Sequence, residues 1–345
     1  MKLSSTIALA AVLAAALVSP LDACTRYLST NKLGVFAARS MNWPESTEPV
    51  LTILPRGMKR EGGMLDGKLI IKENPATWTS KYGSMVTTVY GLGAGEGINE
   101  KGLAGHLLFL RATDYGTRDA SKPGVHGAMW LQYMLDNAAT VEEALKVLDE
   151  VQPVMIDARG HKSTLHVAIE DATGDSAIIE YVGGKRVVHH GKQYQAMTND
   201  PTYDEQLALL KEYDFSKPSS DVKLPGNVKA TDRFVRTVYF GAMLPEPKNE
   251  REAVANMFSI VRNVSVPFGA PYANFGIYNT EYRSVMNVSK GRYYFELTTS
   301  PNVVWVDLSK FSFEAGAPVM LLNPDNVDLS GDVSEKFTKA EKAPY

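Results

Sequence analysis

The spacing of apolar residues changes character four times along this chain, and the resulting order of strand-like and helix-like blocks most constrains its fold. Strand-like stretches lie at 24–43, 49–56, 84–91 and 102–110, helical spacing covers 125–151, strands return over 163–184, helices over 202–264, and strands over 281–308. A doubly wound parallel sheet requires strict alternation of strands and helices, which this order lacks. The order predicts an α+β fold with two antiparallel sheets and helices packed on their outer faces.

Local signals place the first elements. The stretch CTRYLST, from Cys24 to Thr30, is followed by the turn signal NKLG and by VFAARSMNW, which predicts a hairpin that begins at Cys24. In TVEEALKVLDEV, Thr140 and Glu143 have the spacing of a capping box. Residues 323–345 are polar and charged, and they predict a surface tail after a single domain over residues 24–322.

The composition excludes several classes of protein. With 44% hydrophobic and 22% charged residues, the chain is typical of an ordered globular protein. The 36 basic and 39 acidic residues are interspersed and leave a net charge of −3, so the basic footprint of a nucleic-acid-binding protein is absent. We expect no nucleic-acid partner.

The first 23 residues have the pattern of a secretory signal peptide. Lys2 supplies a basic start, Ile7 to Val18 form an apolar run, and the small residue Ala23 precedes the expected cleavage point. The run is too short for a membrane span, which needs about 20 apolar residues. We therefore predict removal of residues 1–23, no membrane span in the mature chain, and a periplasmic or secreted location.

Cys24, the only cysteine, would become the first residue of the mature chain. Three interpretations are open. In a lipoprotein the cysteine is acylated; Leu21 and Ala23 fit the motif for this modification, but Asp22 departs from it, so lipidation is less favoured. In an N-terminal nucleophile, the α-amine, with a pKa of roughly 7.7–8.0, acts as base for the thiol of its own residue. In the third interpretation Cys24 is an exposed cysteine without a role.

Five sequence blocks, in order, resemble the choloylglycine hydrolase family of N-terminal-nucleophile hydrolases, which includes bile salt hydrolases and penicillin V acylases. They are CTRYLST with AARSMNW, GINEKGL at 97–103, STLHVAIEDATGDSAIIEY at 163–181, MTNDPTY at 197–203 and LPGNVKATDRFVR at 224–236. The resemblance extends from Cys24 to about Leu308. It implies a four-layer αββα sandwich of two antiparallel sheets and a homotetramer.

The resemblance also implies roles for individual residues. Cys24 would be the nucleophile, and Arg39 would lie beside its thiol, where a fixed cation favours the thiolate. The two residues can be neighbours only if the hairpin turns near residues 31–34. Asn199 would help to bind the tetrahedral oxyanion. Arg233 would be a second active-site arginine, with Arg236 as the less favoured alternative.

Two positions depart from the family pattern. The family usually has an aspartate three residues after the first arginine, where it orients the N-terminal amine, and this chain has the uncharged Asn42. The second oxyanion donor, an asparagine in bile salt hydrolases and often a tyrosine in penicillin V acylases, falls here on the apolar stretch 107–109. We therefore expect a shifted pH optimum, and a backbone group or another residue in place of that donor.

The six histidines offer a rival Cys–His mechanism. None lies in a recognisable protease motif, and their spacing predicts no metal site because no carboxylate or second thiol completes a tetrahedral set. His166 alternates with apolar residues and is predicted to be a packed strand histidine. No metal and no organic cofactor is expected.

The implied reaction is hydrolysis of a linear amide C–N bond through a thioester on Cys24. Predicted export and the segment LLFLRATDYG are more like Gram-negative members, such as penicillin V acylases and acyl-homoserine lactone acylases, than cytoplasmic bile salt hydrolases. We expect a small-molecule amide with an apolar or aryloxy acyl group; bile salt hydrolysis is the alternative, and an inactive lipid-anchored binding protein is an alternative of another class. Candidates for the acyl pocket are Met41, Trp43, Tyr90 and Phe109.

Overall fold

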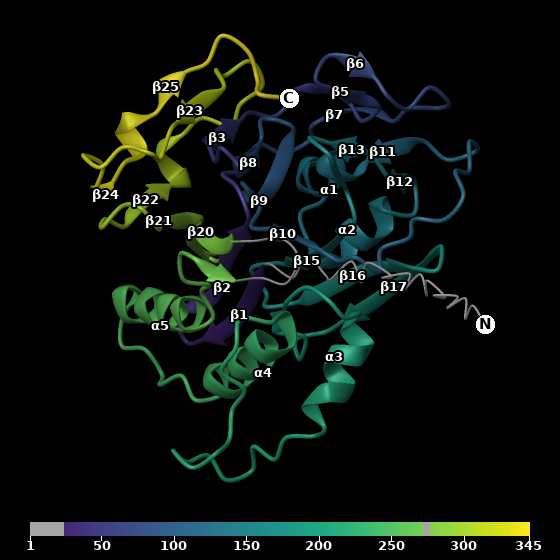
Figure 1. Cartoon of the computed structure of the whole chain (residues 1–345). Helices are drawn as coiled ribbons and strands as arrows, with labels where there is room; N and C mark the ends of the chain where they lie inside the picture. Colours follow the sequence, from purple (N-terminus) through teal and green to yellow (C-terminus); the bar gives the residue numbers. More distant parts are fainter. Residues whose placement is uncertain (1–23, 272–276) are drawn as a thin grey trace, which may run out of the picture.

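The computed structural model describes residues 24–271 and 277–345, so the predicted leader lies outside the described residues. Two large sheets stack face to face in this part of the chain (Figure 1). The first sheet has the order β18 (Ala196–Met197), β1 (Thr25–Asn31), β2 (Gly34–Trp43), β20 (Ile277–Asn287), β21 (Arg292–Leu297), β22 (Val304–Asp307) and β24 (Gly331–Asp332), with β19 (Ala270–Pro271) paired to β20.

The second sheet is antiparallel throughout. Its order is β17 (Lys185–His190), β16 (Ser176–Val182), β15 (Leu165–Glu170), β10 (Ala104–Phe109), β9 (Gly93–Asn99), β8 (Ser84–Val89), β3 (Leu51–Leu54), β23 (Met320–Leu322) and β25 (Thr338–Lys339). The first sheet is antiparallel except where β22 pairs with β24.

Four short two-stranded ribbons complete the described strands. They are β4 (Lys59–Glu61) with β7 (Thr77–Thr79), β5 (Met64–Leu65) with β6 (Lys68–Leu69), β11 (Gly124–His126) with β12 (Gln152–Val154), and β13 (Asp157–Ala158) with β14 (His161–Lys162).

The helices lie on the two outer faces of the stacked sheets (Figure 1). On the second sheet, α1 (Trp130–Asn137) packs against β9 and β10 and is followed by α2 (Val141–Val147). On the first sheet, α4 (Ala230–Gly241) and α5 (Glu250–Asn263) pack against β1 and β2, and α3 (Tyr203–Leu210) lies against α4. One apolar core fills the space between the sheets, and one lies under the helices on each side. The predicted αββα sandwich is confirmed.

The predicted cap at Thr140 is present, but the Glu143 side chain reaches the Ala139 N–H and not the Thr140 N–H of a full capping box. The Thr140 side chain accepts a hydrogen bond from the Glu143 backbone N–H at 3.2 Å, and the Glu143 carboxylate accepts one from the Ala139 N–H at 2.7 Å. The first contact satisfies an N–H group that has no partner within the first turn of α2, and the second fixes the residue before the N-cap.

The first hairpin turns at Lys32 and Leu33, as predicted. Its register pairs Arg26 with Arg39, which brings residue 24 level with Met41. Because alternate residues of a strand face the same side, Cys24, Arg39 and Met41 all point into the space between the sheets. The hairpin therefore assembles these three side chains without help from a loop.

Strand β9 was not predicted, because its sequence GAGEGIN is rich in glycine and glycine is depleted in strands. The glycines are required by close packing. A Cβ atom at Gly93 would lie 2.0 Å from the Ala128 carbonyl oxygen, and one at Gly97 would lie 2.6 Å from the Met85 carbonyl oxygen. Glycine is therefore found in this strand because the neighbouring backbone at Ala128 and Met85 leaves no room for side chains.

The segment after residue 323, expected as a polar surface tail, is folded against both sheets instead. Gly331–Asp332 pairs with β22 and Thr338–Lys339 pairs with β23. Val333 and Phe337 are buried in the core between the sheets. The expectation failed because the apolar residues that anchor the segment are few and widely spaced among polar ones.

We predict that Phe337→Ala lowers the free energy of unfolding by about 3 kcal/mol, as expected for truncation of a buried phenylalanine. The Phe337 ring lies 5.1 Å from that of Phe311, centroid to centroid. Urea denaturation of the mature protein measures the change. Val327→Ala, at a residue 64% exposed, serves as the control and should change stability by less than about 0.5 kcal/mol. Equal, small effects of both substitutions would contradict this packing.

Candidate active site

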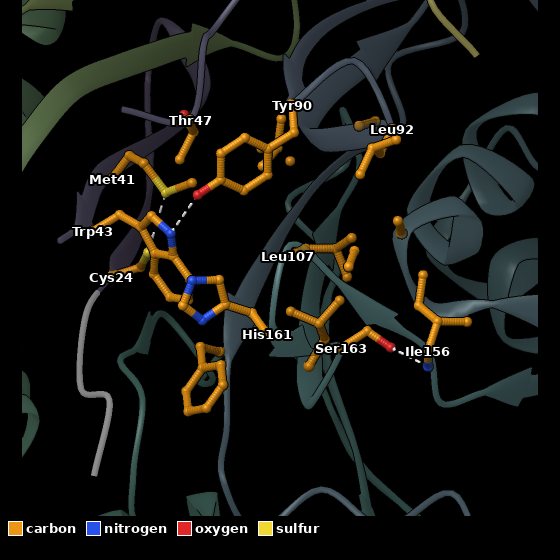
Figure 2. A pocket seen from close by; sticks show the side chains of 18 of the residues that line it. Cys24, Met41, Trp43, Thr47, Tyr90, Leu92, Leu107, Ile156, His161 and Ser163 are labelled. Atoms are coloured by element: carbon orange, nitrogen blue, oxygen red, sulfur yellow. Dashed lines mark hydrogen bonds between the residues drawn. The ribbon is translucent and has the colours of Figure 1, made fainter. Parts of the chain in front are cut away.

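Cys24 lies on the wall of an apolar pocket (Figure 2). The pocket is lined by residues of strands β2, β9 and β10 and of the β13–β14 ribbon. The pocket holds about 810 Å³ of empty space, its open mouth included. All four side chains predicted for the acyl pocket line it: Met41, Trp43, Tyr90 and Phe109. Of the five predicted catalytic residues, Cys24 and Arg39 also line it, whereas Asn42, Asn199 and Arg233 are not among its lining residues.

The Cys24 thiol is held between a cation and a thioether. Arg39 Nη2 lies 3.4 Å from Cys24 Sγ and 3.0 Å from Met41 Sδ, and the two sulfur atoms are 3.5 Å apart. Cys24 and Arg39 are buried. A guanidinium at this distance in a site of low dielectric stabilises a thiolate more than a thiol.

Arg39 is anchored on its other side by Nη1, which donates to the Gly95 carbonyl oxygen at 2.6 Å. Burial disfavours its charge, but the neighbouring acidic groups, Cys24 and the Glu96 carboxylate among them, outweigh burial and raise the pKa of the Arg39 guanidinium above its usual value. Arg39 therefore stays a cation at every relevant pH.

Asn42 is buried on β2 beside Cys24, and its backbone carbonyl oxygen lies 3.9 Å from the thiol sulfur. Its side-chain oxygen accepts a hydrogen bond from the Thr280 hydroxyl at 2.6 Å, and that hydroxyl accepts one from the Val266 N–H at 2.8 Å. The amide is therefore fixed in place by β20.

Arg233 holds the backbone around the thiol but has no described contact with the sulfur. Its Nη1 donates to the Cys24 carbonyl oxygen and to the Thr25 hydroxyl, each at 2.6 Å, and its Nε donates to the Val228 carbonyl oxygen at 2.9 Å. The alternative, Arg236, lies apart from the site, where it bonds the carbonyl oxygens of Pro225 and Asn227. The structure thus brings Arg233, and not Arg236, to Cys24.

Asn199 is linked to Cys24 through Arg233. Arg233 Nη2 donates to the Asn199 side-chain oxygen at 3.1 Å, and Asn199 Nδ2 donates to the Phe109 carbonyl oxygen at 2.7 Å. Phe109 belongs to the apolar stretch where the family's second oxyanion donor was expected. Its ring lines the pocket, so this position contributes an apolar wall and a backbone acceptor.

The rim of the pocket is a set of interlocked aromatic side chains that sequence reasoning found only in part. Trp43 Nε1 donates to the Tyr90 hydroxyl at 2.7 Å, and that hydroxyl donates to Glu45 at 2.7 Å. The His161 ring packs edge-on against Trp43 at 5.2 Å, and the Arg159 guanidinium lies 4.5 Å above the Tyr90 ring. His161 and Arg159 were missed because the short β13–β14 ribbon has no pattern that marks it as part of a site.

The interior of the pocket is aliphatic. Figure 2 shows Leu92, Leu107 and Ile156 on the side away from Cys24, with Trp43, Tyr90 and His161 nearer to the thiol. This arrangement suits an apolar group inserted past the aromatic rim, with the bond to be attacked near the sulfur.

The remaining predictions can be compared with the part of the chain that the structure describes. His166 is a buried strand histidine, as expected, and its Nδ1 lies 2.9 Å from Glu180. Over residues 24–271 and 277–345, no three His, Cys, Asp or Glu side chains are grouped to hold a metal ion. No helix in the same residues is long and apolar enough to cross a membrane.

Comparison with known proteins gives a consistent result. Residues 24–321 match the family model described as linear amide C–N hydrolases, choloylglycine hydrolase family. A penicillin V acylase of Pectobacterium atrosepticum is 37% identical over 99% of this chain and 96% of its own length. A bile salt hydrolase/transferase of Clostridium perfringens is 26% identical over 83% of this chain and 93% of its own length. The resemblance drawn from the five sequence blocks is confirmed.

Solved structures agree with the sequence matches. The penicillin V acylase from Agrobacterium tumefaciens has a TM-score of 0.82 and is 39% identical, with 92% of this chain and 98% of that chain covered. A conjugated bile acid hydrolase from Clostridium perfringens has a TM-score of 0.73 at 23% identity, which is a likeness of fold.

We predict that Arg39→Gln slows alkylation of Cys24 by iodoacetamide about tenfold at pH 7, because the cation 3.4 Å from the sulfur is lost. Mass spectrometry of the mature protein measures the rate, and the signal is specific because the chain has one cysteine. Arg236→Gln is the matched control and should leave the rate unchanged. An unaltered rate in Arg39→Gln would show that the guanidinium does not activate the thiol.

Proposed function

Since this chain belongs to the choloylglycine hydrolase family of linear amide C–N hydrolases, we propose that it cleaves its amide substrate with Cys24 as an N-terminal nucleophile. The observation that carries this proposal is the Cys24 sulfur on the wall of an apolar pocket, 3.4 Å from the Arg39 guanidinium. The family match begins at residue 24, which supports removal of the preceding residues.

Removal of the leader is part of the proposed mechanism. Cleavage after Ala23 creates an α-amine on the residue that carries the thiol, and this amine serves as the general base. The thiolate attacks the substrate carbonyl, the amine transfers the proton to the departing nitrogen, and water then releases the acid from the thioester. We propose export to the periplasm or the medium as the setting, because the leader has the pattern of a secretory signal.

Asn199 is the proposed donor to the oxyanion. An asparagine amide has two N–H donors, and one of them is used on the Phe109 carbonyl oxygen. Arg233 fixes the orientation of the amide through its side-chain oxygen. The second N–H is the group that remains for the tetrahedral intermediate, where one such donor contributes about 10²–10³ in rate.

We propose an apolar or aryloxy acyl group as the preferred substrate feature. The aliphatic interior offers few polar partners, and the aromatic side chains of Trp43, Tyr90 and Phe109 suit a ring or a chain that passes between them. The similarity to two penicillin V acylases supports the same preference. Acyl-homoserine lactones with long chains are proposed on the same ground.

A homotetramer stays a prediction of the resemblance, which sedimentation of the mature protein tests.

Bile salt hydrolysis is the alternative within the family, supported by similarity to bile salt hydrolase/transferases at 26% identity. An inactive lipid-anchored binding protein is the alternative of another class. The intact mass of the mature protein distinguishes the lipid-anchored alternative from the hydrolase. Acylation of Cys24 would add the mass of the acyl groups and would block the amine that acts as base.

We predict that the mature protein hydrolyses penicillin V or a long-chain acyl-homoserine lactone faster than glycocholate, and that Cys24→Ser lowers kcat at least about a thousandfold. Product release in a three-substrate assay measures both effects, with circular dichroism to show that the variant is folded. Activity on glycocholate alone would refute the acyl preference. Full activity of Cys24→Ser would refute the nucleophile.

We further predict that Asn42→Asp moves the acidic limb of the kcat/KM profile to higher pH by about half a unit to one unit. A carboxylate beside the N-terminal residue favours the ammonium form, so a higher pH is needed to free the base. Thr280→Val is the control, because it removes the hydrogen bond to Asn42 without adding charge. A limb that stays in place in Asn42→Asp would show that this side chain does not act on the amine.

A further inference from the structure

A chain of buried charged side chains runs between the two sheets behind Cys24. Its members come from five strands: Arg26 on β1, Arg39 on β2, Glu96 on β9, His106 on β10 and Glu170 on β15, and all are buried. Burial costs several kcal/mol per ion unless each charge is paired, so the chain is maintained by its internal contacts.

His106 bridges the two glutamates. Its Nδ1 lies 3.0 Å from Glu96 Oε2, and its Nε2 lies 2.8 Å from Glu170 Oε1. A neutral imidazole has one N–H and can donate to one carboxylate, whereas an imidazolium donates to both. Burial disfavours the charged ring, but the charge of Glu170 and the hydrogen bonds to both glutamates outweigh burial and raise the pKa of His106.

Both glutamates are held as anions by other partners as well. Glu170 pairs with Arg26 at 2.5 Å. Glu96 accepts hydrogen bonds from the Ser284 and Tyr293 hydroxyls, each at 2.8 Å. Burial alone would raise the pKa values of both glutamates. For Glu96, His106, Arg39 and Ser284 outweigh burial and lower the pKa. For Glu170, Arg26 and His106 outweigh burial and bring the pKa to about 2.

The other ionisable groups near this chain include three tyrosines, the nucleophile and Arg233. Burial raises the pKa of Tyr203, which lies near Arg26, so this phenol is neutral. Arg233 donates to the Cys24 carbonyl oxygen on the other side of the nucleophile. Tyr293 lies on β21 against Glu96, and Tyr282 lies on β20 near Arg39 and Cys24. Burial raises the pKa of both phenols well above the usual value, so both are neutral. The five members of the chain therefore carry three positive and two negative charges, and a neighbour that can balance the excess is the Cys24 sulfur beside Arg39.

We propose that His106 is a positioning residue. Arg26 neutralises Glu170, and the buried positive charge of His106 neutralises Glu96, which leaves Arg39 free to stabilise the Cys24 thiolate. The inference rests on the proposed role of Cys24 as nucleophile. Without the charge on His106, the charges of the two arginines and the two glutamates sum to zero. The positive charge of Arg39 is then needed to stabilise the Glu96 carboxylate as well as the thiolate.

The test is the pH dependence of Cys24 alkylation by iodoacetamide in the mature protein. His106→Gln should move the midpoint to higher pH by about half a unit to one unit, which at pH 7 means a rate about 3- to 10-fold lower. The double variant His106→Gln/Glu170→Gln removes one charge of each sign, so its midpoint should return toward that of the unmodified enzyme.

His166→Gln is the matched control. His166 is also buried on an inner strand and bonded to a glutamate, Glu180, but it has no described contact with the chain of charges. It should lower the melting temperature without moving the midpoint. If His106→Gln also leaves the alkylation midpoint unchanged, or if the double variant moves the midpoint to still higher pH, His106 has only a structural role and the proposal is overturned.

Glu170→Gln covers the case in which His106→Gln does not fold. It adds to the positive excess, so its midpoint should move to lower pH, and a midpoint that rises or stays in place would overturn the proposal. Alkylation needs no substrate turnover. Failure to hydrolyse any test amide would therefore count against the proposed function alone, and an unmoved midpoint in an active enzyme would count against this inference alone.

Discussion

The geometry around Cys24 depends on one strand register, the pairing of Arg26 with Arg39 in the first hairpin. Because the side-chain period of a strand is two, a slip of one residue would turn Arg39 toward the α5 side and leave the thiol without a cation. The pairing of β2 with β20 supports the same register from the other edge, with Arg39 opposite Ser284. The cation beside the nucleophile is thus positioned by β2, an interior strand of the sheet, where backbone motion is small.

Positive charge is concentrated on the protein side of the thiol, where β2 contributes Arg39 and α4 contributes Arg233. Arg39 and Arg233 are both fully buried. Arg39 donates a hydrogen bond to the Gly95 carbonyl oxygen, and Arg233 donates one to the Cys24 carbonyl oxygen. These contacts reduce the cost of burial and make both cations rigid. The opposite side of the sulfur is apolar. A substrate therefore meets a fixed electrostatic field at its carbonyl and a nearly uncharged surface along its acyl group.

Much of the fold could be predicted from sequence because it follows from local signals. The turn at residues 32–33 and the helix cap at Thr140 each depend on neighbouring residues alone. Strand β9 and the strands after residue 323 could not be predicted, since they exist only through packing against distant segments. The same division holds in the site. Cys24, Arg39 and Trp43 share one hairpin, whereas Arg159 and His161 reach the rim from a ribbon whose sequence carries no signal.

The bare face of β9 limits how this pocket can change. Gly93, Ala94 and Gly95 form one wall, and a larger residue at Gly93 would collide with the Ala128 backbone. That wall is also where Arg39 is anchored, through the Gly95 carbonyl oxygen. Variation at this wall would disturb the nucleophile before it altered the fit of a ligand. Adaptation to a new acyl group is therefore confined to the opposite walls, where side chains can be exchanged without moving the catalytic cation.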